Sequence, residues 1–283
     1  MIAHLKTINL GWRKSMPEGP EVKTTVDFLK SYEGKKLTKL TVLSGRYTKK
    51  PIDNMNNPNW KLPLNLQNVD CKGKFIYFSF QEDVFFFNTL GMTGMWSNNP
   101  SKHSRLRLEF EGESTPLFYN DMRNFGTFKI ALSKKDLDKK LKSLGPDFLK
   151  DGWGPDTFYA LIKKKPNKTI TEFLMNQKNV SGIGNYLKAE CLYDAKISPH
   201  RFCAHITTEE ASKLFHACRR IIQLSYQTGG ATIQNYRKPN GKKGLYSQRF
   251  AVYNQKTSPC GNEIIKEQTL DKRTTHWVPA VQK

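Results

Sequence analysis

The stretch Met16-Pro17-Glu18-Gly19-Pro20-Glu21-Val22 determines how the rest of the chain is interpreted. If translation starts at Met16 and this methionine is trimmed, Pro17 becomes a free secondary amine. Such an amine, when unprotonated, attacks an aldehydic or acetal carbon and forms an iminium ion directly. Glu18 then lies beside the nucleophile as a proton donor. The stretch therefore predicts Schiff-base catalysis by Pro17.

An ordinary helix start is the alternative explanation for the same residues. Pro20 suits the first turn of a helix, and acidic residues suit its positive end. Val22, Val26 and Leu29 are spaced as one apolar face. This interpretation needs no catalysis, and the choice between the two depends on the rest of the chain.

The composition indicates a globular protein that binds a polyanion. The chain has 283 residues, of which 37% are hydrophobic and 12% aromatic, so it is long enough for two or three compact units. It carries 46 Lys and Arg against 25 Asp and Glu, a formal charge of +21, and its pI is near 9.7. Nucleic acid is the expected partner. The alternative is an ordinary basic protein from an AT-rich genome.

The cysteines predict a reducing compartment, which here would be one with access to DNA. Their number is odd and no two form a C-x2-C pair, which argues against a disulfide scaffold; they are Cys71, Cys191, Cys203, Cys218 and Cys260. The sequence contains no run of about 18 apolar residues, so no membrane span is expected. Residues 1–15 are expected to be an extension or the product of a misassigned start.

Periodicity predicts an α+β multidomain chain. Residues 16–145 hold a leading helix and then short alternating segments such as Ile76-Tyr77-Phe78-Ser79-Phe80, which predict a catalytic β-sandwich domain. Residues 146–235 change to helical spacing and include the capping box Thr207-x-x-Glu210. Residues 236–283 begin with a basic loop. Alternation at Phe250 and Val252, with apolar residues again at 264–265, predicts a small hairpin there.

Gln177 to Asn185 contains a Gly-x-Gly turn between two predicted helices. The backbone amides of such a turn can face a phosphate at a helix N-terminus. A plain turn between helices is the alternative, because similar turns occur in many proteins.

These motifs together resemble the formamidopyrimidine-DNA glycosylase and endonuclease VIII family, and the resemblance covers about residues 16–283. It implies that Pro17 is the nucleophile, that Glu18 is the acid, and that Lys74 contacts phosphate and assists proton transfer. Gly19 fits the endonuclease VIII pattern better, because the formamidopyrimidine branch usually has leucine at this position. Without the resemblance, Lys74 would be a solvated charge at a strand end.

The resemblance also implies a set of DNA-binding residues. Met92, Arg123 and Phe125 would fill the gap that a flipped nucleotide leaves, although Met122 replaces the family proline before the arginine. His103 and Asn185 would contact the DNA backbone. Taken alone, His103 is a solvated loop residue and Phe125 a core aromatic. Glu21 and Glu190 match acidic family positions and would orient the N-terminus, or else cap helices.

The C-terminal segment 270–277 resembles the tip of the family's zinc finger, and Arg273 matches its arginine. Cys260 is the only cysteine of the first ligand pair, and Val278 and Val281 occupy the spacing of the second. One thiol cannot hold a tetrahedral zinc ion, so we predict a zincless finger with no metal and no cofactor.

The function that the resemblance implies is a bifunctional DNA glycosylase and AP lyase of base excision repair. It would remove oxidised bases and cleave the strand by β/δ-elimination, acting as a monomer on damaged double-stranded DNA. If Pro17 is not N-terminal, the alternative is a catalytically inactive protein that binds lesions. A structural RNA-binding protein is the third possibility. Lesion preference stays open, because Gly19 favours oxidised pyrimidines while the loop from Asn235 to Tyr246 resembles a purine-capping loop.

Overall fold

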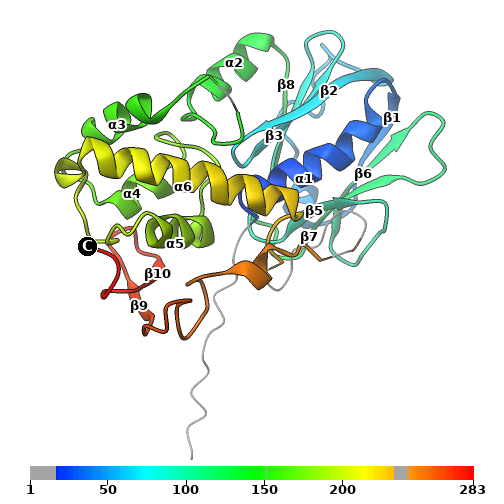
Figure 1. Cartoon of the computed structure of the whole chain (residues 1–283). Coiled ribbons are helices and arrows are strands. Elements are labelled where there is room, and N and C mark those ends of the chain that lie inside the picture. The colour runs from blue at the N-terminus through cyan, green and yellow to red at the C-terminus, as the bar shows by residue number, and fades with distance from the viewer. Residues whose placement is uncertain (1–16, 151, 233–240, 242) are drawn as a thin grey trace, which may run out of the picture.

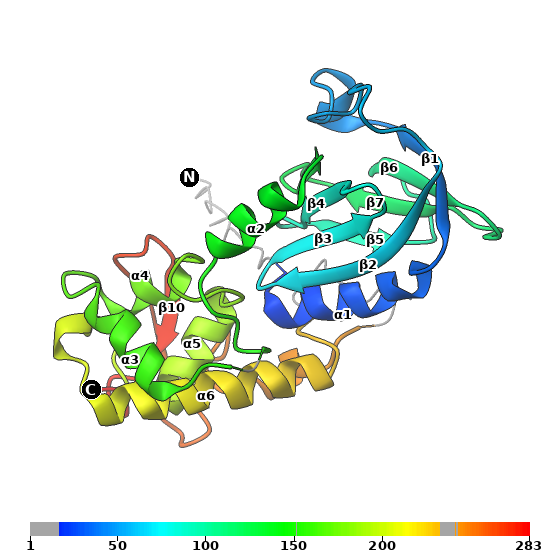
Figure 2. The same cartoon turned by 90° about the horizontal axis from the view of Figure 1, so that it is seen from above.

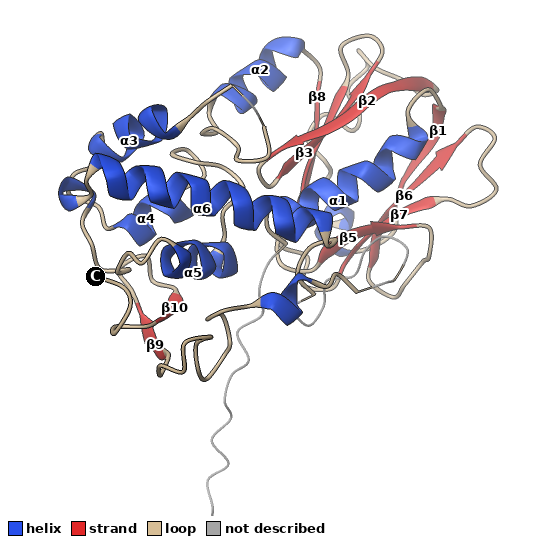
Figure 3. Ribbon diagram, in the orientation of Figure 1, coloured by secondary structure: helices blue, strands red, loops and turns tan. Residues whose placement is uncertain are grey.

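A computed structural model describes residues 17–150, 152–232, 241 and 243–283 of the chain. Figure 1 shows a sheet-rich half and a helical half that meet along the first helix and the longest helix. Figure 3 separates the strands of the first half from the helices of the second. The predicted α+β class is confirmed.

The sheet-rich half contains eight strands, and one helix precedes them. Helix α1 spans Gly19–Leu29. The strands are β1 Lys36–Val42, β2 Leu64–Lys72, β3 Phe75–Phe80, β4 Phe85–Thr89, β5 Gly94–Ser97, β6 Ser104–Phe110, β7 Leu117–Asp121 and β8 Thr127–Ala131. All pairings are antiparallel, in the order β5-β7-β6-β1-β2-β3-β4-β8. Short 3-10 helices follow α1 at Lys30–Tyr32 and β1 at Gly45–Thr48.

The sheet folds over itself, so that its first and last strands face each other across a common core. Trp96 on β5 donates its indole N–H to Asn88 Oδ1 on β4 at 3.0 Å, and its ring packs 5.5 Å from that of Phe78 on β3. The alternation in β6 is regular, with Leu106, Leu108 and the strand's other even-numbered residues buried. This is the predicted β-sandwich. In Figure 2, α1 lies between this sheet and the end of helix α6.

The helical half holds α2 Lys134–Lys142, α3 Pro155–Lys163, α4 Ile170–Met175, α5 Asn185–Asp194 and α6 Thr208–Gln227, with a 3-10 turn at Cys203–His205. The predicted capping box opens α6, where Thr207 Oγ1 accepts from Glu210 N. Two glycines with positive φ, Gly229 and Gly230, follow that helix and end it. Within the described ranges, no helix has the length and apolar content that a bilayer crossing requires.

The C-terminal segment packs on the helical half and shares its core. It contains a 3-10 turn at Tyr246–Arg249 and a two-stranded hairpin of β9 Ile265–Gln268 and β10 Thr274–Trp277. Val252 and Val278 are fully buried in the same cluster as the apolar residues of α5 and α6. The hairpin was expected, but the prediction that Phe250 and Val252 belong to it was wrong. The backbone N–H groups of residues 251–253 are bound by the carboxylate of Glu190, so this segment forms no strand.

Candidate active site and DNA-binding surface

Glu18 lies at the junction of the two halves, directly after Pro17 and at the N-cap of α1. Its side chain is 1% exposed. The carboxylate accepts hydrogen bonds from the backbone N–H groups of Gly184 at 2.7 Å, Tyr186 at 3.0 Å and Leu187 at 3.3 Å. An acidic side chain from the sandwich is thus held at the N-terminus of α5, where the helix dipole favours negative charge.

These bonds correct one expectation. The backbone amides of the Gly-x-Gly turn were expected to face a DNA phosphate. The amide of Gly184, together with those of Tyr186 and Leu187 in the first turn of α5, instead binds Glu18, and Gly182 N–H donates to Gln177 Oε1 at 3.0 Å. The turn is glycine-rich for a steric reason as well, because a Cβ at Gly184 would lie 2.3 Å from Glu18 Cδ.

Burial raises the pKa of Glu18 to about 7, and the positive charge of Lys74 opposes the shift. Burial likewise lowers the pKa of Lys74, while the charges of Glu18 and Glu21 act in the opposite direction. Arg273 lowers it further, so the finger arginine acts electrostatically on the same site. A carboxyl group that keeps its proton near neutral pH is suited to general-acid chemistry.

Glu21 holds the backbone of Glu18 in place. Its Oε2 accepts from Glu18 N–H at 2.7 Å, while its Oε1 accepts from Tyr186 Oη at 2.9 Å and from Ala231 N–H. The side chain is 1% exposed, and burial raises its pKa. Glu21 thus orients the N-terminal residues and also caps α1, because its bond to Glu18 N–H is half of a capping box, so both explanations of Glu21 hold. Glu190 does not orient the N-terminal residues, because its carboxylate is used by the C-terminal segment.

Lys74 lies in the tight turn between β2 and β3, and this turn touches the helical half. Gly73 has φ +57 and donates its N–H to Asp147 Oδ2 at 2.7 Å. A Cβ at Gly73 would lie 2.5 Å from Gly182 N, so only glycine fits here. Pro17 is buried at the same junction. Met16 precedes Pro17 in the sequence. The nitrogen of Pro17 is therefore an amide until the bond between Met16 and Pro17 is cut.

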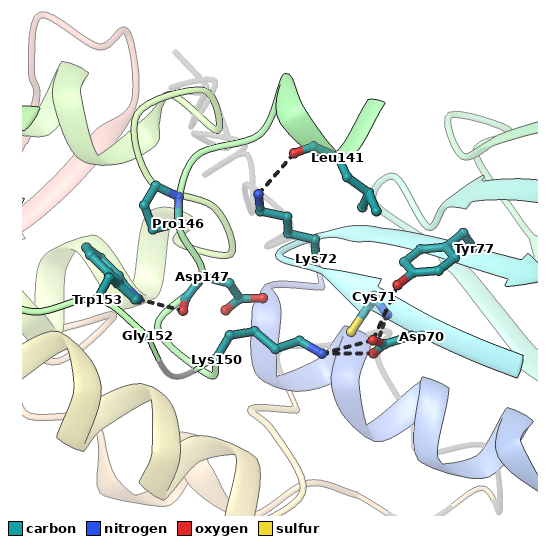
Figure 4. A pocket seen from close by; sticks show the side chains of 10 residues that line it. All are labelled: Asp70, Cys71, Lys72, Tyr77, Leu141, Pro146, Asp147, Lys150, Gly152 and Trp153. Carbon is teal, nitrogen blue, oxygen red and sulfur yellow. Dashed lines mark hydrogen bonds and ion pairs between the residues drawn. The ribbon is translucent and has the colours of Figure 1, made fainter. Parts of the chain in front are cut away.

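A cleft of about 390 Å³ lies beside the end of β2, where Asp70, Cys71 and Lys72 line it (Figure 4). In its wall, Lys150 Nζ lies 3.0 Å from Asp70 Oδ2. Lys72 Nζ donates hydrogen bonds to the carbonyl groups of Leu141 and Leu144. These contacts join β2 to the segment that leads into the helical half. The residues that line the cleft include none of the predicted catalytic side chains.

Met92, Arg123 and Phe125 come together on two adjacent loops. Arg123 Nη1 lies 3.0 Å from Met92 Sδ, and the guanidinium carbon is 4.5 Å from the centre of the Phe125 ring. Phe125 is 54% exposed, which excludes the alternative that it is a core aromatic. A large exposed apolar group beside a cation suits insertion into a base stack. Met122 is exposed as well, and its loop is braced by Arg105, which donates to Asp121 O and Met122 O.

His103 and Asn185 are positioned differently from one another. His103 is partly exposed, and its carbonyl accepts from Asp121 N–H at 2.9 Å, so it lies beside the loop of Arg123. Asn185 is the first residue of α5 and donates its side-chain amide to Thr274 O in the finger at 2.8 Å. A phosphate contact by either side chain stays a prediction.

Arg273 is exposed at the tip of the β9–β10 hairpin, after Lys272 with φ +60. The residues near the expected zinc position do not suit a metal. Val278 is fully buried among apolar side chains, Cys260 is exposed, and no group of three His, Cys, Asp or Glu side chains gathers anywhere in the described ranges. Gln282 closes this end instead, since it accepts from Val278 N–H and donates to Ile197 O.

Several residues that hold the site were not predicted from sequence. Tyr186, Asp147 and Lys188 are buried polar groups that join separate segments. The available signal was weak. Lys188 is the one Lys or Arg in the stretch Asn-Tyr-Leu-Lys-Ala-Glu-Cys-Leu of α5, between Leu187 and Ala189.

Comparison with known proteins covers nearly the whole chain. Residues 16–128 match the formamidopyrimidine-DNA glycosylase N-terminal domain, 144–237 its H2TH domain and 247–283 its C-terminal domain. The formamidopyrimidine-DNA glycosylase of Ureaplasma parvum is 31% identical over 279 residues, which cover 94% of this chain and 100% of that protein. That of Thermus thermophilus is 32% identical over 219 residues, or 76% of this chain and 81% of that one.

Solved structures agree with the sequence comparison. The crystal structure of MutM (Fpg) from Thermus thermophilus superposes with a TM-score of 0.82 at 29% identity, covering 94% of this chain and 98% of that one. A Lactococcus lactis Fpg mutant in complex with Fapy-dG-containing DNA gives 0.83 at 27% identity, with 94% and 100% covered.

A β-sandwich joined to a helix-two-turn-helix unit through a buried, proline-adjacent glutamate defines a class of DNA glycosylases. Within that class, the chain belongs to the formamidopyrimidine-DNA glycosylase family. Its placement in the endonuclease VIII branch stays a prediction.

Proposed function

We propose that this chain excises oxidised bases from damaged duplex DNA and then cleaves the strand, with the nitrogen of Pro17 as the nucleophile. Its family makes it a DNA N-glycosylase with AP-lyase activity in base excision repair, and damaged double-stranded DNA its partner. The observation that carries the mechanism is the buried Glu18 carboxyl. It follows Pro17 directly and is held by three amides of the H2TH unit.

In the first step, the lone pair of Pro17 nitrogen attacks C1′ of the damaged nucleotide. Glu18 donates its proton to the ring oxygen as the sugar opens. The bond between C1′ and the base breaks, the base leaves with the bonding electron pair and takes up the proton that the attacking Pro17 nitrogen loses, and the nitrogen becomes part of an iminium ion at C1′. A Glu18 pKa of about 7 keeps a large fraction of the acid protonated at neutral pH.

Strand cleavage follows from the iminium ion. It acidifies C2′, and loss of a C2′ proton expels the 3′ phosphate by β-elimination. A second elimination releases the 5′ phosphate and leaves a one-nucleotide gap. Lys74 contacts the phosphate and assists proton transfer at the sugar. Burial, which lowers its pKa, brings its amine closer to the neutral form that accepts a proton.

DNA docks along the basic surface, since the chain carries a net charge of +21. The cluster of Met92, Arg123 and Phe125 fills the gap in the duplex and supports the orphaned base. His103, Asn185 and Arg273 contact the backbone. The finger works without zinc, and the protein acts as a monomer.

We also propose that it works where thiols stay reduced. All five cysteines lie in the described ranges and are free, and four of them are buried. The third possibility, a structural RNA-binding protein, is not favoured, because the family match includes the N-terminal domain as well as the H2TH unit.

The experiment compares two purified forms, one that starts at Pro17 and one that keeps residues 1–16, with their termini verified by intact mass. Each is incubated with a duplex that contains an abasic site or an oxidised pyrimidine, and borohydride is added. We expect a covalent protein–DNA adduct from the Pro17 form alone. Equal trapping by both forms would overturn the role of Pro17, and binding without trapping by either would support the inactive lesion-binding alternative.

A further inference from the structure

Helix α5 and the finger hairpin are joined by an ion pair that is sealed from solvent. Lys188 Nζ lies 2.5 Å from Asp271 Oδ2, and the two side chains are 0% and 3% exposed. A buried charge is costly unless it is paired, so each partner fixes the position of the other. No other ion pair described in the structure has both side chains buried to this extent.

The second oxygen of Asp271 sets the conformation of the hairpin tip. Oδ1 accepts from Thr269 Oγ1 at 2.6 Å and from the backbone N–H of Arg273 at 3.1 Å. The tip is closed further by Thr269 N–H, which donates to Arg273 O at 3.1 Å. The carboxylate that Lys188 holds therefore binds the backbone of the residue expected to contact phosphate.

Helix α5 also holds Glu18, from its first turn. The amides of Tyr186 and Leu187 bind Glu18, and the next residue along the helix is Lys188. One rigid turn of helix thus fixes both the acid and the hairpin that carries Arg273. Asn185, the first residue of α5, donates its side-chain amide to Thr274 O, so the chain next to Arg273 lies beside the turn that binds Glu18.

We propose that Lys188 is a positioning residue, which through Asp271 fixes Arg273 at the DNA phosphate in register with Glu18. The inference rests on the proposed function, since it takes the DNA contact of Arg273 as given. Lys188 is too deeply buried to meet DNA itself.

The test uses the double variant Lys188→Met/Asp271→Asn, which leaves neither charge unpaired and keeps an oxygen for the two tip donors. Binding to lesion duplex is measured over a range of salt concentrations in four proteins: wild type, Arg273→Ala, the double variant and the triple variant. Loss of one phosphate contact lowers the slope of log Kd against log salt by about 0.9. We expect this decrease in Arg273→Ala and in the double variant. We expect Arg273→Ala to change Kd by less than about twofold when added to the double variant.

Leu192→Ala is the matched control for general damage, because Leu192 is fully buried on the same helix. It should lower the melting temperature and retain both the wild-type slope and the full effect of Arg273→Ala. If the double variant also retains the wild-type slope and the full effect of Arg273→Ala, the role of Lys188 is refuted. If Arg273→Ala itself leaves binding and slope unchanged, the proposed DNA contact fails instead, so the two failures are distinguishable.

Discussion

Gly184 donates its backbone N–H to Glu18 Oε2 at 2.7 Å, and its Cα leaves no space for a side chain next to that carboxyl. The contact joins residues 166 positions apart and belongs to both halves of the protein. The geometry of the proposed acid therefore depends on a residue that takes no part in the chemistry.

Substitution Gly184→Ala tests this dependence. The added Cβ would lie 2.3 Å from Glu18 Cδ, so either the carboxyl group or the turn has to move. We expect a loss of about 1–3 kcal/mol in the free energy of unfolding and a decrease of about 100-fold or more in base excision. Gly154→Ala is the control, because nothing lies within 4 Å of a Cβ there. Unfolding and single-turnover excision measure the two effects, and equal behaviour of the two variants would contradict the prediction.

Glu18→Gln should separate binding from chemistry. It keeps the shape of the side chain and removes the proton, so we expect lesion binding to persist and excision to fall about 10²–10⁴-fold. Cleavage of a preformed abasic site should suffer less, because that sugar already opens without the acid. An unchanged excision rate would assign the acid role elsewhere, to Glu21 for example.

The pH profile of the wild type follows from the same group. The acid is active while protonated, and burial raises its pKa to about 7. Single-turnover excision should therefore lose its Glu18 contribution as the pH rises through about 7. This limb should be absent from the residual rate of Glu18→Gln. A profile in which the variant keeps the same limb would show that another group titrates.

Phe125→Ala should weaken DNA binding without weakening the fold. The ring is 54% exposed, so we expect its removal to change the free energy of unfolding by less than about 0.5 kcal/mol. A stacked ring contributes about 1–3 kcal/mol to binding, so its loss should raise Kd about 5- to 150-fold. Phe128→Ala is the contrasting control, because its ring is 3% exposed and its loss should cost about 3–5 kcal/mol of stability. If Phe125→Ala binds lesion DNA like the wild type, the ring does not enter the duplex.

The finger should be indifferent to metal removal. Val278 is buried where a ligand would be needed, and Gln282 closes the turn. Elemental analysis should find far less than one zinc per chain, and activity should survive a strong chelator. Stoichiometric zinc together with loss of activity on chelation would show that the finger holds a metal after all.

His276 should make the protein less stable in acid. Its ring is 3% exposed and neither ring nitrogen has a hydrogen-bond partner, and burial, with the charges of Lys266 and Lys188, lowers its pKa from 6.5 to about 4. Protonation thus favours the unfolded chain: stability is full above pH 6.5 and falls as the pH drops from there towards 4. We expect this to cost about 1–2 kcal/mol.

The variant His276→Phe should remove much of that loss, as measured by urea unfolding at a series of pH values. His216→Gln, on the exposed face of α6, is the control and should retain it. An unchanged pH dependence in His276→Phe would assign the loss to other groups.

Patterns local in sequence predicted much of this architecture. Period-two segments such as residues 76–80 in β3 and the capping box of α6 report their own environment, so they were confirmed. The exposed cluster of Arg123 and Phe125 was also anticipated, but through resemblance to a family, since nothing in the local pattern separates an exposed ring from a core one.

The remaining features depend on contacts between distant residues. The alternation at Phe250 and Val252 predicted a strand, but Glu190, some 60 positions earlier, takes up the amides that a strand would need. The turn before Asn185 was expected to bind phosphate because its amides looked free. The amide of Gly184 is occupied by Glu18, a partner that no local pattern reveals, and that of Gly182 by Gln177.

Three glycines meet where the two halves touch. Gly19 donates its N–H to Gly182 O at 2.9 Å, and a Cβ at Gly19 or Gly73 would lie within 3.2 Å of backbone atoms of Gly182. Here the two halves approach backbone to backbone, and Ser181 and Asp147 supply the side chains closest to the three glycines. We therefore expect any change in the angle between the sandwich and the helical unit to turn about this point, so that Pro17 and Glu18 move less than the outer surfaces.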